Sequence, residues 1–341
     1  MLFSVISPEL LTILAMVIPF AGSLVIGPKL IAVLRAMKAG QPIREARKGV
    51  LAPEHSSKVG TPTMGGLMLI GLVLLTALLV CDLTDPRIQC CIIVTLITAF
   101  LGFLDDYAKI TKKSTDGVSG WFKIALQFIA ATGCAFYLYS ACPDVCDIYV
   151  PFYGLLNISW GFIPLAILVI IGTSNAVNLT DGLDGLASGC MIIAALAFCA
   201  ICSFVPGGIN LPTYLLPIIA ACAGFLWFNC NPARVFMGDT GSLALGGALG
   251  TIGVCSGLEL ILVVIGGVFV AEALSVMIQV GWFKFTRIKF GEGRRIFRMA
   301  PIHHHFEKGG LSETQVCVRF WIVAAILAFV GILLFFSCLG H

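Results

Sequence analysis

Charge is scarce in this sequence. Only 11% of the 341 residues are Asp, Glu, Lys or Arg, whereas soluble domains carry about 25%. Hydrophobic residues make up 59%, and the mean hydropathy is +1.01. Intrinsic disorder is therefore excluded, and a soluble globule could not bury so much apolar surface. What remains is an all-α, polytopic membrane protein that forms a single domain over residues 1–341.

Several other features are absent. The one CxxC spacing, Cys199 to Cys202, lies inside an apolar run. No internal repeat, coiled-coil heptad or low-complexity tract occurs, and the net charge of +3 is not gathered into one basic stripe. These absences argue against a disulfide framework and a nucleic-acid-binding module. Most of the 14 cysteines lie in apolar runs as small hydrophobes. Cys142 and Cys146 lie in a polar loop and could pair with each other.

Long apolar segments dominate what is present. About 20 apolar residues cross a bilayer as one helix, and ten segments of the chain qualify. The first is too long for a cleaved signal peptide and no basic stretch precedes it, so we expect it to be retained. The predicted spans are 10–34, 64–81, 88–104, 123–141, 159–177, 186–205, 211–228, 241–257, 259–281 and 316–339.

The basic residues fall on one side of these spans. Of the 21 Lys and Arg residues, 19 lie in or beside the loops 35–63, 105–122, 178–185, 229–240 and 282–315. Arg87 alone lies in the opposite set. The positive-inside rule therefore places these five loops in the cytoplasm and both termini on the periplasmic side.

Polar motifs concentrate in the same five loops. A transporter would carry ionisable residues near the middle of the membrane, and the clearest such residue is Glu272, after a kink predicted at Gly266 and Gly267. An enzyme that joins a lipid phosphate to a soluble substrate would place its polar residues at the cytoplasmic ends. The distribution favours an enzyme.

Two motifs lie in the first two loops. In the segment 58–66, three glycines allow close backbone approach and Lys58 offers a cation for phosphate, although Lys58 at a span end also suits snorkelling. Asp105 and Asp106 end the third span, where acidic residues oppose the helix dipole. The pair predicts a Mg²⁺ site or a general base; the alternative is an ion pair with Lys109 on the same helix face.

The third and fourth motifs are also acidic. Asn175, Asn178, Asp181 and Asp184 recur every third residue, on one side of a helix if it continues, although Gly182 and Gly185 suggest that it breaks. No basic residue in that loop neutralises the two acids, which favours a metal or a nucleotide ribose. Asp239 follows the segment 229–238 and suits either a helix cap or a metal ligand.

The last loop carries Pro301-Ile-His-His-His-Phe-Glu307. Adjacent residues on a helix point about 100° apart, so His303, His304 and His305 would not all bind one metal. Hydrogen bonding to phosphate is the favoured interpretation, and zinc is the alternative.

Together these motifs resemble the MraY family, the phospho-N-acetylmuramoyl-pentapeptide transferases of the polyprenyl-phosphate N-acetylhexosamine-1-phosphate transferase superfamily. The resemblance rests on segments 60–66, 105–109, 175–187, 236–242 and 301–307 and covers essentially the whole chain. It implies transfer from UDP-N-acetylmuramoyl-pentapeptide to undecaprenyl phosphate, which gives lipid I and UMP with Mg²⁺. It also implies the bacterial inner membrane and a role in peptidoglycan synthesis.

The resemblance also implies roles for individual residues. Asp105 matches the base that deprotonates the lipid phosphate, with Asp106 beside it, and Asp239 matches the Mg²⁺ ligand. Further matches are Asp184, Asn229, Phe236 and Gln279 for the uridine site, Lys58 and Lys123 as cations for the phosphates and the uracil pocket, and His303, His304 and His305 for the pyrophosphate, His303 first. Asn175, Asn178 and Asp181 belong to the same substrate-binding motif.

Besides the transporter, a second enzyme activity and the oligomeric state stay open. A sister enzyme that transfers N-acetylglucosamine-1-phosphate would keep Asp105, Asp106 and Asp239 but should lack the triple His. Small-residue faces on several spans suit internal helix packing or a homodimer.

Overall fold

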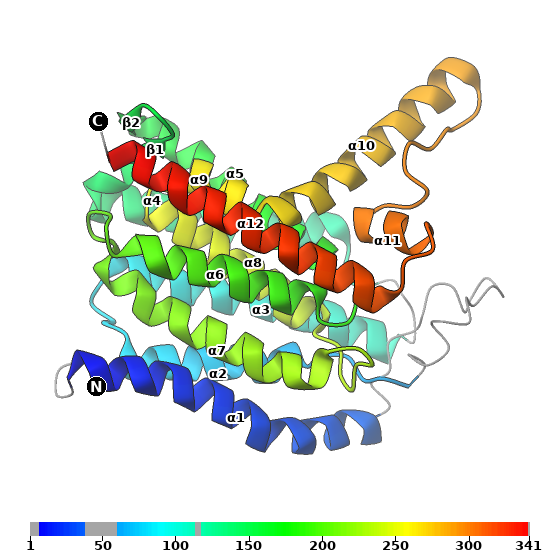
Figure 1. The fold of residues 1–341 in the computed structure, drawn as a ribbon, viewed down its shortest axis with the longest axis horizontal. Helices are drawn as coiled ribbons and strands as arrows, with labels where there is room; N and C mark the ends of the chain where they lie inside the picture. Colours follow the sequence, from blue (N-terminus) through cyan, green and yellow to red (C-terminus); the bar gives the residue numbers. More distant parts are fainter. Residues whose placement is uncertain (1–6, 38–59, 113–116, 340–341) are drawn as a thin grey trace.

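The computed structural model describes residues 7–37, 60–112 and 117–339. It is a bundle of helices that run roughly side by side (Figure 1), and it confirms the all-α prediction apart from one short hairpin. The helices are α1 (Pro8–Ala36), α2 (Gly66–Val80), α3 (Pro86–Thr111), α4 (Gly120–Ala141), α5 (Phe162–Thr180), α6 (Leu186–Cys202), α7 (Leu211–Asn229), α8 (Gly238–Cys255), α9 (Glu259–Ile265), α10 (Gly267–Phe290), α11 (Ile302–Glu307) and α12 (Glu313–Leu339).

Membrane-crossing length is common among these helices. Within the described ranges, seven are long and apolar enough to cross a membrane, namely α1, α3, α4, α5, α7, α10 and α12. The shorter helices α2 and α6 are also apolar. The chain is therefore a polytopic membrane protein. The start of α1 and the end of α12 lie at the same end of the bundle (Figure 1).

Each predicted span coincides with helical residues, but the third and the ninth spans differ from the helices in extent. α3 continues to Thr111 and α10 to Phe290, beyond the predicted ends at 104 and 281. Charged residues occupy both extensions, so hydropathy alone ends the segment too early. The ninth segment breaks at Gly266 into α9 and α10, near the predicted kink. α10 then leans away from the other helices (Figure 1).

The central helix is α8. Every residue from Thr240 to Cys255 is buried, although the helix is rich in glycine rather than in large apolar residues. Glycine lets neighbouring backbones approach closely, which is how membrane helices pack without a large hydrophobic gain. A Cβ at Gly102 of α3 would overlap the Asp239 backbone, and a Cβ at Gly66 of α2 would overlap Gly241. These glycines bring α2 and α3 onto the first turn of α8.

The helix that ends the third motif does not continue. α5 ends at Thr180 with Asp181 as its C-cap, and α6 begins after Gly185, whose φ is +81°. The break suggested by the glycines is confirmed, and Asn175, Asn178, Asp181 and Asp184 do not form one helical row. We call residues 181–185 the α5–α6 turn.

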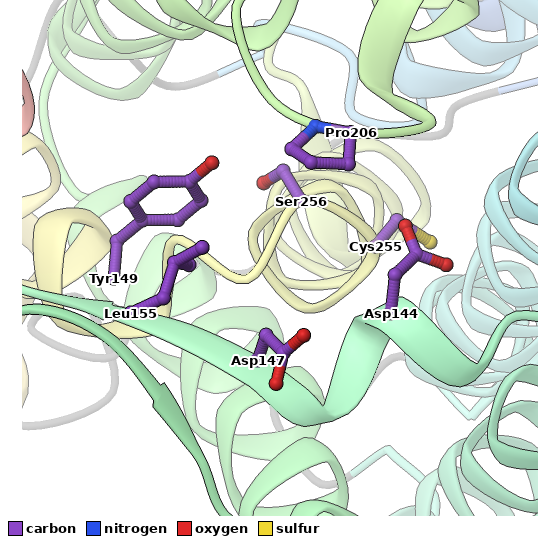
Figure 2. A pocket seen from close by; sticks show the side chains of 7 residues that line it. All are labelled: Asp144, Asp147, Tyr149, Leu155, Pro206, Cys255 and Ser256. Atoms are coloured by element: carbon purple, nitrogen blue, oxygen red, sulfur yellow. The ribbon is translucent and has the colours of Figure 1, made fainter. Parts of the chain in front are cut away.

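The opposite end of the bundle carries an unexpected hairpin. Strands β1 (Asp147–Val150) and β2 (Gly154–Asn157) pair antiparallel, with Asp147 opposite Asn157. Strands of four residues are too short to show a periodic pattern in the sequence. A small pocket lies there (Figure 2), lined by Asp144, Asp147, Tyr149, Leu155, Pro206, Cys255 and Ser256. Cys142 and Cys146 are both free thiols, so the suggested disulfide is not formed.

Candidate active site

Three carboxylates meet where α3 ends and α8 begins. Asp105, Asp106 and Asp239 each offer an oxygen, and these oxygens lie within 4.8 Å of one another. Asp105 and Asp106 are buried, and Asp239 is partly exposed. Residues more than 130 positions apart in the chain thus form one acidic cluster, because the glycine contacts bring the two helix ends together.

Asp106 caps the N-terminus of α8. Its Oδ1 accepts a hydrogen bond from the Asp239 N–H at 3.1 Å, and its Oδ2 accepts from the Thr240 N–H at 3.0 Å and the Thr240 hydroxyl at 2.7 Å. A helix N-terminus favours a negative charge at this position. Gly238 has a φ of +74°, and a Cβ there would lie 2.5 Å from Asp106 Oδ2. Asp106 therefore fixes where Asp239 sits.

Two lysines bridge the other two acids. Lys109 Nζ lies 2.6 Å from Asp105 and 3.2 Å from Asp239. Lys123 Nζ, from α4, lies 2.9 Å from Asp105 and 2.8 Å from Asp239. The pairing of Asp105 with Lys109 along α3 is thus present, but it belongs to a network that joins three helices. Cations for the acidic cluster come from α3 and α4 rather than from the α5–α6 turn.

Polar groups on α5 complete one side of the cluster. Asn178 Nδ2 donates to Asp239 Oδ1 at 3.0 Å and to Ser242 Oγ at 2.8 Å. One turn earlier, Asn175 donates to Gln127 of α4 at 2.9 Å, and Gln127 donates to the buried Ser174 at 2.9 Å. Asn178 therefore orients Asp239, whereas Asn175 ties α5 to α4.

Asp181 lies beside the same cluster. Burial raises the pKa of Asp181 well above its usual range, and the charges of Asp239 and Asp106 raise it further. The Asp181 carboxyl group is therefore harder to ionise than an exposed one.

The donor set of the acidic cluster suits a divalent cation. Magnesium prefers oxygen ligands at about 2.0–2.1 Å, so ligands on opposite sides of the ion lie roughly 4 Å apart, within the spread of the three carboxylates. Asp239, the most exposed of the three, would be the principal ligand, because most of the lone pairs of Asp106 already accept hydrogen bonds. The ammonium groups of Lys109 and Lys123 compete for the same oxygens.

Residues 88–257 match the model of Glycosyl transferase family 4. We call this part of the chain, which is similar to that family, the family 4 region. It runs from the start of α3 to the turn after α8 and contains the whole acidic cluster together with Lys109 and Lys123. The family supports a polyprenyl-phosphate sugar-1-phosphate transferase, with a polyprenyl phosphate as acceptor and a nucleotide sugar as donor, and an acidic cluster that could bind a metal ion is consistent with it.

Asp184 and Asn229, also within the family 4 region, connect loops to each other. Asp184 Oδ2 accepts hydrogen bonds from Asn231 Nδ2 and from the Ala233 N–H, both at 3.0 Å. Asn229 Oδ1 accepts from the Gly185 N–H at 3.1 Å, and its Nδ2 donates to the Val235 carbonyl at 3.0 Å. These contacts hold the loop after α7 onto the α5–α6 turn. The predicted contact of both residues with uridine stays a prediction.

Phe236 stands at the end of that loop. Its N–H donates to the Pro62 carbonyl at 2.8 Å, and its carbonyl accepts from the Gly65 N–H at 2.9 Å. These backbone bonds hold Phe236, which lies in the fourth motif, against the first motif, and the residue is partly buried. Lys58, from the first motif, lies outside the described residues.

The remaining predicted residues lie beyond the family 4 region. Gln279 Oε1 accepts from the N–H groups of Ile296 and Phe297, both at 3.0 Å, and its Nε2 donates to the Phe297 carbonyl at 3.0 Å. Gln279 thus fastens the loop after α10 back onto that helix. Its predicted contact with uridine stays untested.

The three histidines of α11 point in different directions, as expected. His303 is fully buried and its Nδ1 lies 3.0 Å from Glu272 Oε2. His304 Nδ1 lies 2.6 Å from Glu307, and His305 Nδ1 accepts from the Arg298 N–H at 3.1 Å. Among the described residues, the one cluster suited to a metal contains no histidine. This geometry does not favour the zinc alternative.

Sequence reasoning missed several supporting residues. Gln127, Thr240 and Ser242 all bond to the predicted site residues. Gln127 is a single amide inside an apolar run, and Thr240 and Ser242 lie in the segment 236–242 but were given no role of their own. The N–H of Asp184 donates to Glu313 at 2.7 Å, which links the α5–α6 turn to α12. The sequence singled out Glu272 as an acid within a span, but it did not predict that Glu272 pairs with His303.

Proposed function

We propose that this protein transfers phospho-N-acetylmuramoyl-pentapeptide from its UDP-linked donor to undecaprenyl phosphate, giving lipid I and UMP. The observation that carries the proposal is the acidic cluster, which lies at one end of a bundle of apolar helices and inside the family 4 region. The MraY-like segments 175–187 and 301–307 point to this donor. Such a site brings a membrane-held phosphate and a soluble diphosphate together.

The residues of the cluster take separate roles in this reaction. Asp105 accepts the proton of the lipid phosphate, whose oxygen then attacks the sugar-bound phosphorus of the donor as the bond to UMP breaks. Lys109 and Lys123 supply positive charge for the phosphate oxygens. A Mg²⁺ ion held by Asp239 would neutralise the diphosphate when bound. Asn178 holds Asp239 in place.

A sister N-acetylglucosamine-1-phosphate transferase is the second candidate, because the family match covers the motifs common to both enzymes. The two differ in the donor sugar. Purified protein in detergent should release UMP from UDP-N-acetylmuramoyl-pentapeptide and should leave UDP-N-acetylglucosamine almost unused. The reverse preference would replace the proposed donor by the second candidate.

The transporter alternative loses its main support. Glu272, the residue on which it rested, pairs with His303 rather than facing an open path. We therefore keep the enzyme as the proposal and place it in the bacterial inner membrane, with the acidic cluster facing the cytoplasm.

This orientation predicts the outcome of thiol labelling. Single cysteines at positions 284–312, in a background with Cys230 replaced by Ser, should react with an impermeant maleimide only after the inner membrane is opened. A cysteine at Phe152, exposed on the hairpin at the opposite end, is the matched control and should react in intact spheroplasts. Labelling of the first group in intact spheroplasts would reverse the orientation.

A further inference from the structure

A buried pair joins α10 to α11. The side chains of Glu272 and His303 are each 0% exposed, and Glu272 Oε2 lies 3.0 Å from His303 Nδ1. Their other polar atoms, Glu272 Oε1 and His303 Nε2, have no hydrogen-bond partner among the described residues. Buried polar atoms without partners are rare and costly. The pair therefore requires an explanation other than stability.

The free edge of the imidazole faces the α5–α6 turn. A Cβ at Gly182 would overlap His303 Nε2 and would lie 2.6 Å from its Cε1. The ring thus fills the space that a side chain at position 182 would take. In the tautomer that carries its hydrogen on Nδ1, His303 donates this hydrogen bond to Glu272 Oε2. That contact sets the rotation of the ring and aims Nε2 at the turn.

The α5–α6 turn lies between the acidic cluster and the loop after α7. On one side, the turn directly follows the end of α5, where Asn178 donates a hydrogen bond to Asp239. On the other side, Asp184 holds Asn231 and Ala233 of the loop after α7. A shift of Gly182 would therefore change the spacing between the acidic cluster and that loop.

We propose that Glu272 is a positioning residue for the transfer reaction. It holds the His303 ring against Gly182, and the ring holds the α5–α6 turn in register with Asp239 and with the loop after α7. This inference rests on the proposed function, because it concerns how the donor is seated. It assigns no contact with substrate to Glu272 itself.

The test compares two substitutions of similar size. Glu272→Met fills the volume but offers no acceptor, and Glu272→Gln keeps an amide oxygen for the Nδ1–H of His303. We expect Glu272→Met to raise the donor KM and lower the donor kcat/KM by about 10- to 100-fold, the usual effect of losing such a supporting hydrogen bond. Glu272→Gln should recover most of this loss, and the KM for undecaprenyl phosphate should not change.

Glu259→Met is the matched control. Glu259 is also buried and lies at the start of α9, and its carboxylate oxygens have no hydrogen-bond partner in the part of the chain that the structure describes. Its replacement should leave both KM values at the wild-type level. The positioning role is overturned if Glu272→Met behaves like this control. It is also overturned if kcat falls while both KM values stay at the wild-type level, because that is the result of having less folded enzyme.

A second variant guards against misfolding of Glu272→Met. His303→Asn keeps an N–H near the Nδ1 position but lacks the Nε2 edge, so it should also raise the donor KM; a wild-type KM would overturn the proposal. Wild-type protein that released UMP from neither donor would instead overturn the proposed function. The coupling of Glu272 and His303 would then be tested by thermal unfolding of the two single variants and the double variant. Additive shifts in Tm would show that the two side chains do not act as a unit.

Discussion

Replacing Asp239 by Ala is expected to reduce transfer by about 10³-fold or more, because the divalent cation supplies several kcal/mol of charge stabilisation in phosphoryl transfer. The fold should survive. Asp106 would still accept from the backbone N–H groups of residues 239 and 240, which do not depend on the lost side chain. Lys109 and Lys123 would keep Asp105 as a partner. The measurement is UMP release over a series of Mg²⁺ concentrations, beside a thermal unfolding curve.

Asp82→Asn is the control for this substitution. Asp82 accepts hydrogen bonds from its neighbour Thr84 in the turn before α3, away from the acidic cluster. The control should keep wild-type turnover and the wild-type response to Mg²⁺. Near-normal activity of Asp239→Ala would place the metal elsewhere and would remove the main role assigned to the start of α8.

Replacing Asp105 by Asn is expected to lower turnover by about 10²-fold or more, the usual contribution of a general base. The amide keeps the shape of the side chain and still accepts the Val118 N–H bond, which measures 2.8 Å in the structure. The loss should shrink as the pH rises, because a phosphate monoester sheds its second proton near pH ~6 and then needs no base. Donor KM should change little. The measurement is kcat over a pH series.

The same substitution separates two roles for Asp105. If the carboxylate only neutralises Lys109 and Lys123, Asp105→Asn lowers the thermal stability and leaves the shape of the pH profile unchanged. A fully active variant with the wild-type pH profile would contradict the general-base role and would transfer that role to Asp106 or to the metal alone.

Hydropathy predicted where the helices lie but not how they end. The apolar run of α3 stops near residue 104, so the sequence pattern gives no reason to continue the helix to Thr111. The extension exists because Asp105, Asp106 and Lys109 find partners on α8 and α4, and such contacts are not encoded by local periodicity. The break at Gly266 was predictable, since two adjacent glycines weaken a helix.

The acidic residues of the site were identifiable from the sequence, whereas the separate structural role of each acid was not. Asp105, Asp106 and Asp239 stood out because acids are rare in this chain and unusual beside a bilayer. The chain alone did not predict that Asp106 would cap α8 or that Lys123 would bridge to Asp239, because both depend on how closely glycines let the helices approach. The burial of His303 was likewise not predictable from the sequence, because it depends on the packing of α11 against Gly182.

The most direct measurement for this account is the identity of the released nucleotide. Purified protein would be incubated with UDP-N-acetylmuramoyl-pentapeptide, undecaprenyl phosphate and Mg²⁺, and both products would be analysed by mass spectrometry. Phosphoryl transfer at the acidic cluster predicts UMP, together with a lipid that carries the sugar through a diphosphate. Release of UDP, with the sugar joined to the lipid through a single phosphate, would mean that the sugar carbon is attacked instead and would contradict the account.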